Sequence, residues 1–179
     1  MSRIQALDPD AVQGKAKELL EKIKAKQGRV SNIMKTLAHA PVALQAFLGM
    51  SGALADAKLS LKIREQIALV VGEDNQCHYC VAAHSAIGKH AGLTPEEIEG
   101  GRRAQSPDAK IQAILGLSKK LSANRGNITD QEFDAVKKAG CSDEEILEVV
   151  TAVGLNLFTN YINHVADTAL DFPAVPPLS

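Results

Sequence analysis

The fold is decided by residues 61–84, which read LKIREQIALVVGEDNQCHYCVAAH. Residues 61–71 have the apolar spacing of a helix, and Ser60 stands where a helix N-cap is expected. Residues 72–76 are typical of a turn, and a second helix is predicted from Cys77 onward. The stretch therefore predicts two consecutive helices, with a C-x-x-C pair at the start of the second.

Helix start signals recur along the rest of the chain. Three segments have the capping-box pattern, in which an N-cap hydroxyl and a Glu three residues later satisfy each other's backbone N–H groups: Thr94–Glu97, Thr129–Glu132 and Ser142–Glu145. Further helices are expected to open at Asp8-Pro9-Asp10, at Pro41 and at Ser106-Pro107.

The sequence predicts an all-α fold, because no run of strict apolar–polar alternation is bounded by turn residues. We expect residues 1–179 to form one domain, with the redox motif within residues 60–92. Residues 171–177, which contain three prolines, are expected to form an extended strap. A shift of 80 residues places Glu65 on Glu145 and His84 on His164. This weak echo predicts two similar helical halves, of which only the first has the cysteines.

Composition excludes several classes of function. The 179 residues are 45% hydrophobic and 23% charged, which is typical of globular proteins, and the formal net charge is -1. This balance argues against nucleic acid or an anionic membrane as a partner, and 3% aromatics without Trp argue against a base-stacking surface. The first residues contain no apolar core of signal-peptide length, so we expect a cytoplasmic protein.

The two motif cysteines and a histidine share one predicted helix face. At about 100° per residue, Cys77, Cys80 and His84 lie within roughly 60° of arc. Unpaired N–H groups at a helix start stabilise a thiolate, which is the nucleophilic form of cysteine. Histidine side chains are suited to proton transfer near neutral pH, so His84 is a candidate shuttle, and Glu65 on the preceding helix is placed to orient it or to act as a base through a water.

The motif Glu65–x11–Cys77-x-x-Cys80–x3–His84 resembles that of the alkylhydroperoxidase D (AhpD)-like branch of the carboxymuconolactone decarboxylase superfamily. The similarity extends over roughly residues 30–172 and includes Ala91–Thr94 and the C-terminal segment 160–172. It implies an all-helical, AhpD-like bundle and a peroxide-reducing dithiol centre.

The resemblance also implies roles for single residues. Cys80 is expected to be the peroxidatic cysteine and Cys77 the resolving one, which makes Cys77–Cys80 a redox-active disulfide. Glu65 and His84 are expected to form the proton relay. Members of the family are also thought to pass electrons from a lipoyl-type dithiol donor to a peroxiredoxin, and they are commonly trimers or hexamers.

One position departs from the best-known branch, which has a histidine immediately before the second cysteine. This chain has Tyr79 there and His78 one position earlier, and helix rotation points His78 about 100° away from Tyr79. His78, Tyr79 and His164 remain candidate accessory residues; His164 would face the site if the two predicted halves packed together. Cys141 is expected to be structural.

Three alternatives stay open at this point. Zinc could be held by Cys77, Cys80 and His84, with Glu65 or His78 as the fourth ligand. The decarboxylase branch of the superfamily would act on a lactone, but a cysteine pair is not expected there. A disulfide reductase or redox adaptor for a peroxiredoxin, without peroxidase activity, would use the same dithiol.

We expect a thiol-dependent peroxidase that needs no metal or bound cofactor, with a peroxide substrate and an external dithiol reductant. Residues 42–54 and 149–158 are apolar or small on nearly every helix face, which predicts burial against another copy of the chain. The sequence thus predicts a homo-oligomer with the cysteine site near a subunit boundary, and the family resemblance implies that it is a trimer or a hexamer.

Overall fold

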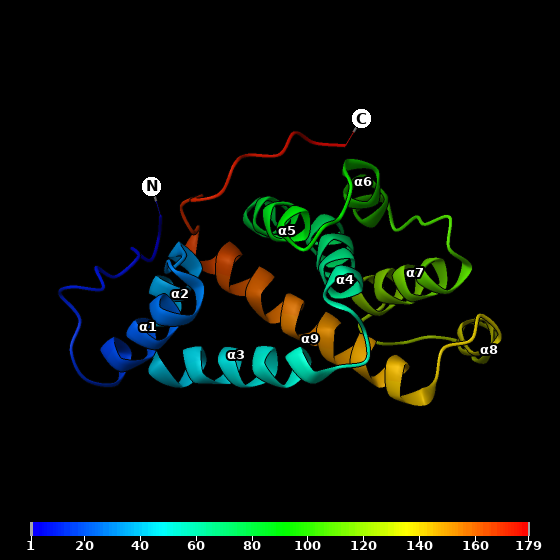
Figure 1. Ribbon diagram of the computed structural model, residues 1–179, viewed down its shortest axis with the longest axis horizontal. Helices are drawn as coiled ribbons and strands as arrows, with labels where there is room; N and C mark the ends of the chain where they lie inside the picture. Colours follow the sequence, from blue (N-terminus) through cyan, green and yellow to red (C-terminus); the bar gives the residue numbers. More distant parts are fainter. Residues whose placement is uncertain (1, 179) are drawn as a thin grey trace.

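The computed structural model describes residues 2–178, and every regular element in that range is a helix (Figure 1). Residues 1 and 179, the ends of the expected 1–179 domain, lie outside the described part. The prediction of an all-α fold is therefore confirmed. The elements are α1 (Gly14–Gln27), α2 (Asn32–Leu37), α3 (Pro41–Ala53), the 3₁₀ turn η1 (Leu54–Asp56), α4 (Leu61–Asp74), α5 (His78–His90), α6 (Pro95–Arg103), α7 (Ala109–Ala123), α8 (Asp130–Lys138) and α9 (Asp143–Ala166).

Helix α4 is the centre of the fold. It packs against α5, α6, α7 and α9, which surround it in Figure 1. Its residues 65–72 are all buried, which explains why this stretch is apolar on more than one face. The Ser60 hydroxyl accepts a hydrogen bond from the Ile63 N–H, so the predicted cap of this helix is present.

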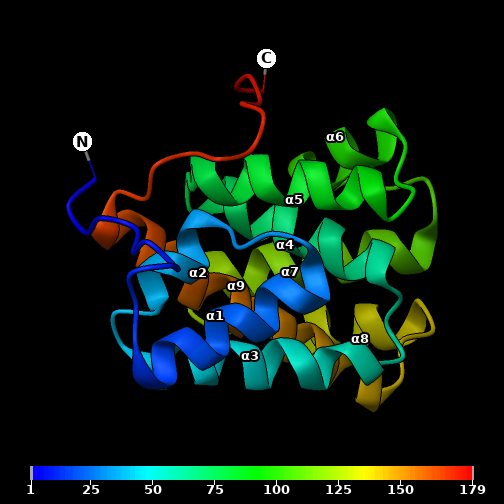
Figure 2. The same ribbon diagram turned by 60° about the vertical axis from the view of Figure 1, so that its left-hand side comes forward.

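Two hydrophobic clusters flank α9. The first joins α4, α7 and α9, and its most buried members include Ile67, Leu115 and Val149. The second joins α1, α2 and α3 to the first turn of α5, and it contains both motif cysteines. Because Phe158 and Ile162 of α9 pack on the second cluster, this 24-residue helix connects the two, and Figure 2 shows α1, α2 and α3 gathered on one side of it.

The three predicted capping boxes are present. The hydroxyls of Thr94, Thr129 and Ser142 each accept a hydrogen bond from the backbone N–H three residues later. The Glu side chain at that later position accepts a hydrogen bond from the backbone N–H of the capping residue. They begin α6, α8 and α9 at the expected residues. The box at Ser142 matters most here, because α9 contributes to the cysteine site.

The turn between α4 and α5 is shorter than the predicted range of 72–76. Helix α4 continues through Asp74, which leaves Asn75 and Gln76 in the turn, with Gln76 at a φ of 55°. A side chain at position 72 would place its Cβ 3.3 Å from a methyl carbon of Val81. Glycine at position 72 therefore lets the first turn of α5 lie directly against the last turn of α4.

Two predicted helix starts are wrong. Asp8 caps a turn in which its carboxylate accepts the Asp10 N–H at 3.0 Å, and α1 begins only at Gly14. At α7 the cap is Asp108 rather than Ser106, because one Asp108 oxygen accepts the N–H groups of both Lys110 and Ile111 at 2.9 Å. In both places an aspartate carboxylate accepts the nearby backbone N–H groups and so determines the local structure, whereas the Asp-Pro or Ser-Pro pattern alone predicts a different helix start.

The expected pair of similar halves is also wrong for this stretch of chain. Residues 61–90 form two helices separated by a turn, whereas residues 143–166, the greater part of the stretch 80 positions later, form the single helix α9. The echo reflects a shared helical period rather than a repeated architecture.

The C-terminal segment leaves α9 and runs without helix across α5 towards α6, as predicted for residues 171–177 (Figure 1). It is fixed at its middle by Asp171 and further on by Arg102, whose Nη2 donates to the Pro176 carbonyl at 2.9 Å. Within residues 2–178, none of the helices has the length and apolar character needed to cross a membrane.

Candidate active site

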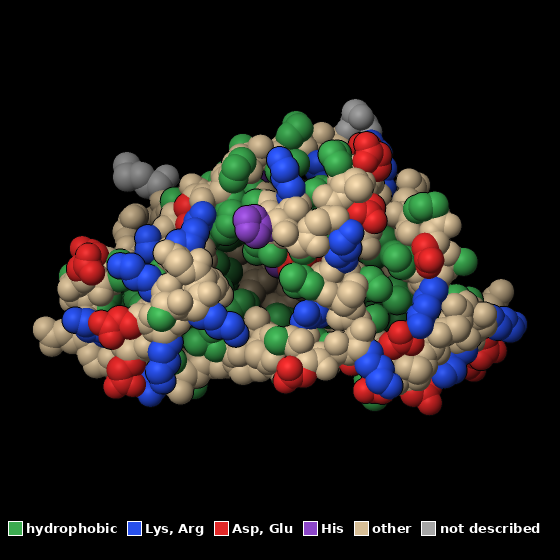
Figure 3. Space-filling view, viewed as in Figure 1, with side chains coloured by type: hydrophobic (Ala, Val, Ile, Leu, Met, Phe, Trp, Pro, Cys, Tyr) green, Lys and Arg blue, Asp and Glu red, His purple; other side chains and the backbone are tan. Residues whose placement is uncertain are grey.

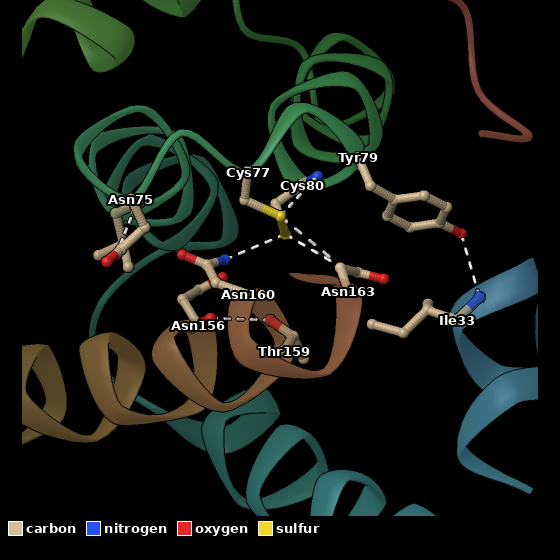
Figure 4. Close-up of a disulfide and its surroundings, with 10 residues drawn as sticks. Ile33, Asn75, Cys77, Tyr79, Cys80, Asn156, Thr159, Asn160 and Asn163 are labelled. Atoms are coloured by element: carbon tan, nitrogen blue, oxygen red, sulfur yellow. Dashed lines mark hydrogen bonds between the residues drawn. A yellow bond between two sulfur atoms is a disulfide. The ribbon is translucent and has the colours of Figure 1, made fainter. Parts of the chain in front are cut away.

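The two motif cysteines form a disulfide at the start of α5. Cys77 is the N-cap and Cys80 lies in the first turn, with their Cα atoms 5.3 Å apart. The Cys80 N–H donates to the Cys77 Sγ at 3.3 Å, so a sulfur takes the place of the usual capping oxygen. Both residues are almost fully buried between α5 and α9 (Figure 4). The predicted intrachain pairing is geometrically realised.

Glu65 and His84 form a hydrogen-bonded pair between α4 and α5. Glu65 Oε2 lies 2.7 Å from His84 Nδ1, and the side chains are 10% and 22% exposed. His84 follows Cys80 by one helical turn on the same face. Because the carboxylate accepts a hydrogen bond from the Nδ1–H, the ring is oriented and its Nε2 is left for exchange of a proton with a reactant. The structure thus brings together all four residues of the predicted centre.

Two asparagines that the sequence analysis did not single out complete the site. Asn160 Nδ2 lies 3.0 Å and Asn163 Nδ2 3.2 Å from the Cys80 Sγ, and both side chains point from α9 towards the disulfide (Figure 4). The sequence contains a signal for these two residues, because polar residues three positions apart share one face of an otherwise apolar helix. The placement of that face against α5 depends on tertiary packing, which the local pattern does not specify.

Tyr79 points away from the cysteines and is a structural anchor (Figure 4). Its hydroxyl donates to Asp171 Oδ1 at 2.6 Å and accepts from the Ile33 N–H at 3.2 Å. Burial, and next the bond to Asp171, raise the pKa of this hydroxyl above its usual value. A phenol held protonated in this way does not replace the family's relay histidine, so the accessory role considered for Tyr79 is not supported.

The other candidate histidines lie on the surface. His78 is exposed on the first turn of α5. His164 is exposed on α9, where its carbonyl accepts a hydrogen bond from Arg3 at 2.8 Å. The packing of two halves under which His164 would face the cysteines is not found, and its neighbour Asn163 occupies the inward face of the helix.

The third cysteine, Cys141, lies apart from the disulfide. It is free and buried in the first hydrophobic cluster, and burial raises the pKa of its thiol.

The zinc alternative requires four ligands close together. In the described range 2–178, no group of three or more His, Cys, Asp or Glu side chains is arranged to hold a metal ion. Of the two suggested fourth ligands, His78 is exposed and Glu65 is hydrogen-bonded to His84.

One face of the molecule is hollowed, and a histidine lies at the rim of the hollow (Figure 3). A separate groove of about 660 Å³ lies on the outer face of α5, between Ser85, Lys89 and Arg102 and the C-terminal segment. The cysteines do not line that groove.

Comparisons with known proteins agree with this architecture. Residues 41–119 match the model of the carboxymuconolactone decarboxylase family. An uncharacterized peroxidase-related protein from Silicibacter sp. TM1040 is 26% identical, with a TM-score of 0.80 over 93% of this chain and 91% of its own. No curated protein sequence matches the chain at a significant level.

Two further solved structures share the fold at lower identity. An alkylhydroperoxidase AhpD core, an uncharacterized peroxidase-related protein from Ralstonia eutropha JMP134, is 24% identical, with a TM-score of 0.83 over 95% of this chain and 92% of its own. The debrominase Bmp8 in complex with 2,3,4-tribromopyrrole is 18% identical, with a TM-score of 0.79 over 94% and 91%. Because one fold can host different chemistries, the activity has to be argued from the site residues.

Proposed function

Since this chain belongs to the carboxymuconolactone decarboxylase superfamily and has its AhpD-like fold, we propose that it is a thiol-dependent peroxidase. The observation that carries the proposal is the Cys77–Cys80 disulfide at a helix start, one turn from a His84 that Glu65 orients at 2.7 Å. This set supplies a nucleophile, a resolving thiol and a proton donor. A lactone decarboxylase would not require the cysteine pair.

The proposed cycle begins with the reduced dithiol. The Cys80 thiolate attacks the O–O bond of the peroxide, forming Cys80 sulfenic acid and releasing an alkoxide, which takes a proton from His84 to leave as an alcohol. The Cys77 thiol then attacks the Cys80 sulfur, and the disulfide forms as water leaves. An external dithiol, of lipoyl type by family resemblance, reduces the disulfide by two exchange steps and becomes a cyclic disulfide itself. No metal, haem or flavin takes part in this cycle.

Peroxide consumption with a panel of dithiol donors tests the proposal. Wild type and Cys141→Ser are expected to turn over, because Cys141 lies outside the site. Cys80→Ser is expected to lose turnover, since it removes the attacking sulfur, and Cys77→Ser to stop after one turnover without its resolving thiol. Turnover retained in Cys80→Ser would contradict the proposal.

The same assay separates the redox-adaptor alternative. An adaptor would consume no peroxide with any dithiol, but would reduce an added peroxiredoxin through the same disulfide. Peroxide loss that depends on an added peroxiredoxin and on both Cys77 and Cys80 would therefore favour the adaptor.

A further inference from the structure

Two buried amides from α9 converge on one of the two disulfide sulfurs. Asn160 and Asn163 lie three positions apart and therefore share a helix face. Their Nδ2 atoms lie 3.0 and 3.2 Å from the Cys80 Sγ, whereas only Asn163 approaches the Cys77 Sγ, at 3.9 Å. The side chains are buried, Asn160 completely. The site thus treats the two sulfurs unequally, in favour of Cys80.

The orientation of these amides leaves their side-chain oxygens without hydrogen bonds. The Oδ1 atoms of Asn160 and Asn163 are buried and have no hydrogen-bond partner within residues 2–178. Asn156, one turn earlier on α9, shows the ordinary arrangement, with its Nδ2 donating to the Ala152 carbonyl at 2.8 Å. Because an unpaired buried oxygen is unfavourable, the N–H groups of Asn160 and Asn163 need a strong acceptor to justify their placement.

A disulfide sulfur is a weak acceptor, but a thiolate carries a full negative charge. Hydrogen bonds to the charged form of a group favour that form, and they are stronger where water is excluded. The same donors retain their positions as charge moves onto or off the sulfur, which is the arrangement that lowers a reaction barrier electrostatically.

We propose that Asn160 and Asn163 are catalytic residues that stabilise negative charge on the Cys80 Sγ and so select Cys80, rather than Cys77, as the attacking thiolate. This inference rests on the proposed function, since it assigns the amides to the first step of that cycle. It also applies to the reductive step. When an external thiolate attacks the Cys77 sulfur, the S–S bond breaks and its electron pair leaves on the Cys80 Sγ, the sulfur that the amides stabilise.

The thiol pKa of Cys80 tests the inference without any peroxide. In a Cys77→Ser, Cys141→Ser background, Cys80 is the one remaining thiol, and the ultraviolet absorbance of its thiolate gives the pKa. Asn160→Ala and Asn163→Ala are each expected to raise that pKa by about one to two units. Asn156→Ala is the matched control on the same helix, and it is expected to leave the pKa unchanged because its amide bonds to its own helix.

The reduction potential of the Cys77–Cys80 pair gives a second readout with both cysteines present. Loss of either amide is expected to make the pair more reducing, because the thiolate form of the dithiol is less stabilised. If an alanine variant loses its helical circular dichroism, Asn160→Leu or Asn163→Leu keeps the volume and removes the N–H. An unchanged or lowered Cys80 pKa in folded variants of both positions would overturn the inference. A raised pKa without peroxide turnover in wild type would contradict only the proposed function.

Discussion

The proton chemistry of the site depends on how Glu65 fixes His84. Replacing the carboxylate with an amide in Glu65→Gln, or removing the ring in His84→Ala, is expected to lower peroxide turnover by about 10²–10⁴-fold, because the leaving alkoxide loses its positioned proton donor. Steady-state kinetics on folded variants measures this. His90→Ala, which removes an exposed histidine at the end of the same helix, is the control. Turnover within about twofold of wild type in both test variants would show that neither residue moves a proton.

The residue scale also shows where sequence reasoning succeeds and where it stops. Helical rotation alone places Cys77, Cys80 and His84 on one face, because their spacing fits a turn of about 100° per residue. Asn160 and Asn163 lie some 80 positions away, and only the crossing of α9 under the start of α5 brings them to the sulfur. That crossing is a product of packing between helices rather than of local spacing.

At the scale of elements, Tyr79 fastens the first turn of α5 to two other parts of the chain. Its hydroxyl joins Asp171 of the C-terminal segment to the Ile33 N–H of α2, and its ring meets Phe172 edge-on with 5.7 Å between centroids. Arg29 adds to the same junction, with its Nη2 2.6 Å from Asp171 Oδ2. The segment that holds the disulfide is therefore positioned by α2 and by the C-terminal strap.

This junction gives the stability of the fold a dependence on alkaline pH. The pKa of Tyr79 is raised in the native state, so above about pH 10 the unfolded chain releases a proton that the native chain retains. The unfolded state then binds fewer protons, and the free energy of unfolding falls as pH rises. Tyr79→Phe is expected to lower stability at neutral pH by about 1–3 kcal/mol and to show a smaller alkaline loss.

Urea unfolding across neutral and alkaline pH measures both effects. Tyr161→Phe is the matched control, because Tyr161 is the only other tyrosine and is 58% exposed on α9. The control is expected to follow wild type at every pH. If Tyr79→Phe followed wild type as well, the hydroxyl would have no part in the junction.

The helix starts show which elements a sequence can predict. The sequence pattern locates the boxes at Thr94, Thr129 and Ser142 correctly, because both partners of each box lie within four residues. It places the end of α4 too early, because Gly72 and the polar residues after it also suit a turn. Contact with the first turn of α5 through Gly72 keeps residues 72–74 helical, and that contact cannot be predicted from the local sequence.

For the whole molecule, the fold class followed from helical periodicity and from the absence of alternating runs, and the structure confirms it. The apolar residues 42–54 predict burial of α3 against another copy of the chain. Within the single chain, Leu44 is the one buried residue of α3, and Val42 is 75% exposed. Val150 of α9 is 45% exposed, although it too lies in a stretch expected to be covered. A single chain does not supply the surface that would cover these side chains.

We therefore expect the protein to assemble as a homo-oligomer, a trimer or a hexamer, with the exposed face of α3 in the contact. Burying Val42 and its apolar neighbours against another copy removes that surface from water, which is favourable by about 25 cal/mol per Å². Light scattering and sedimentation over a range of concentrations measure the state. Val42→Asp is expected to shift the population towards smaller species, because it places a charge in the contact. Val165→Asp, at an exposed position near the end of α9, is expected to leave the assembly as it is. A wild-type chain that stayed monomeric at every concentration would contradict the assembly and would leave the apolar face of α3 without a partner of its own kind.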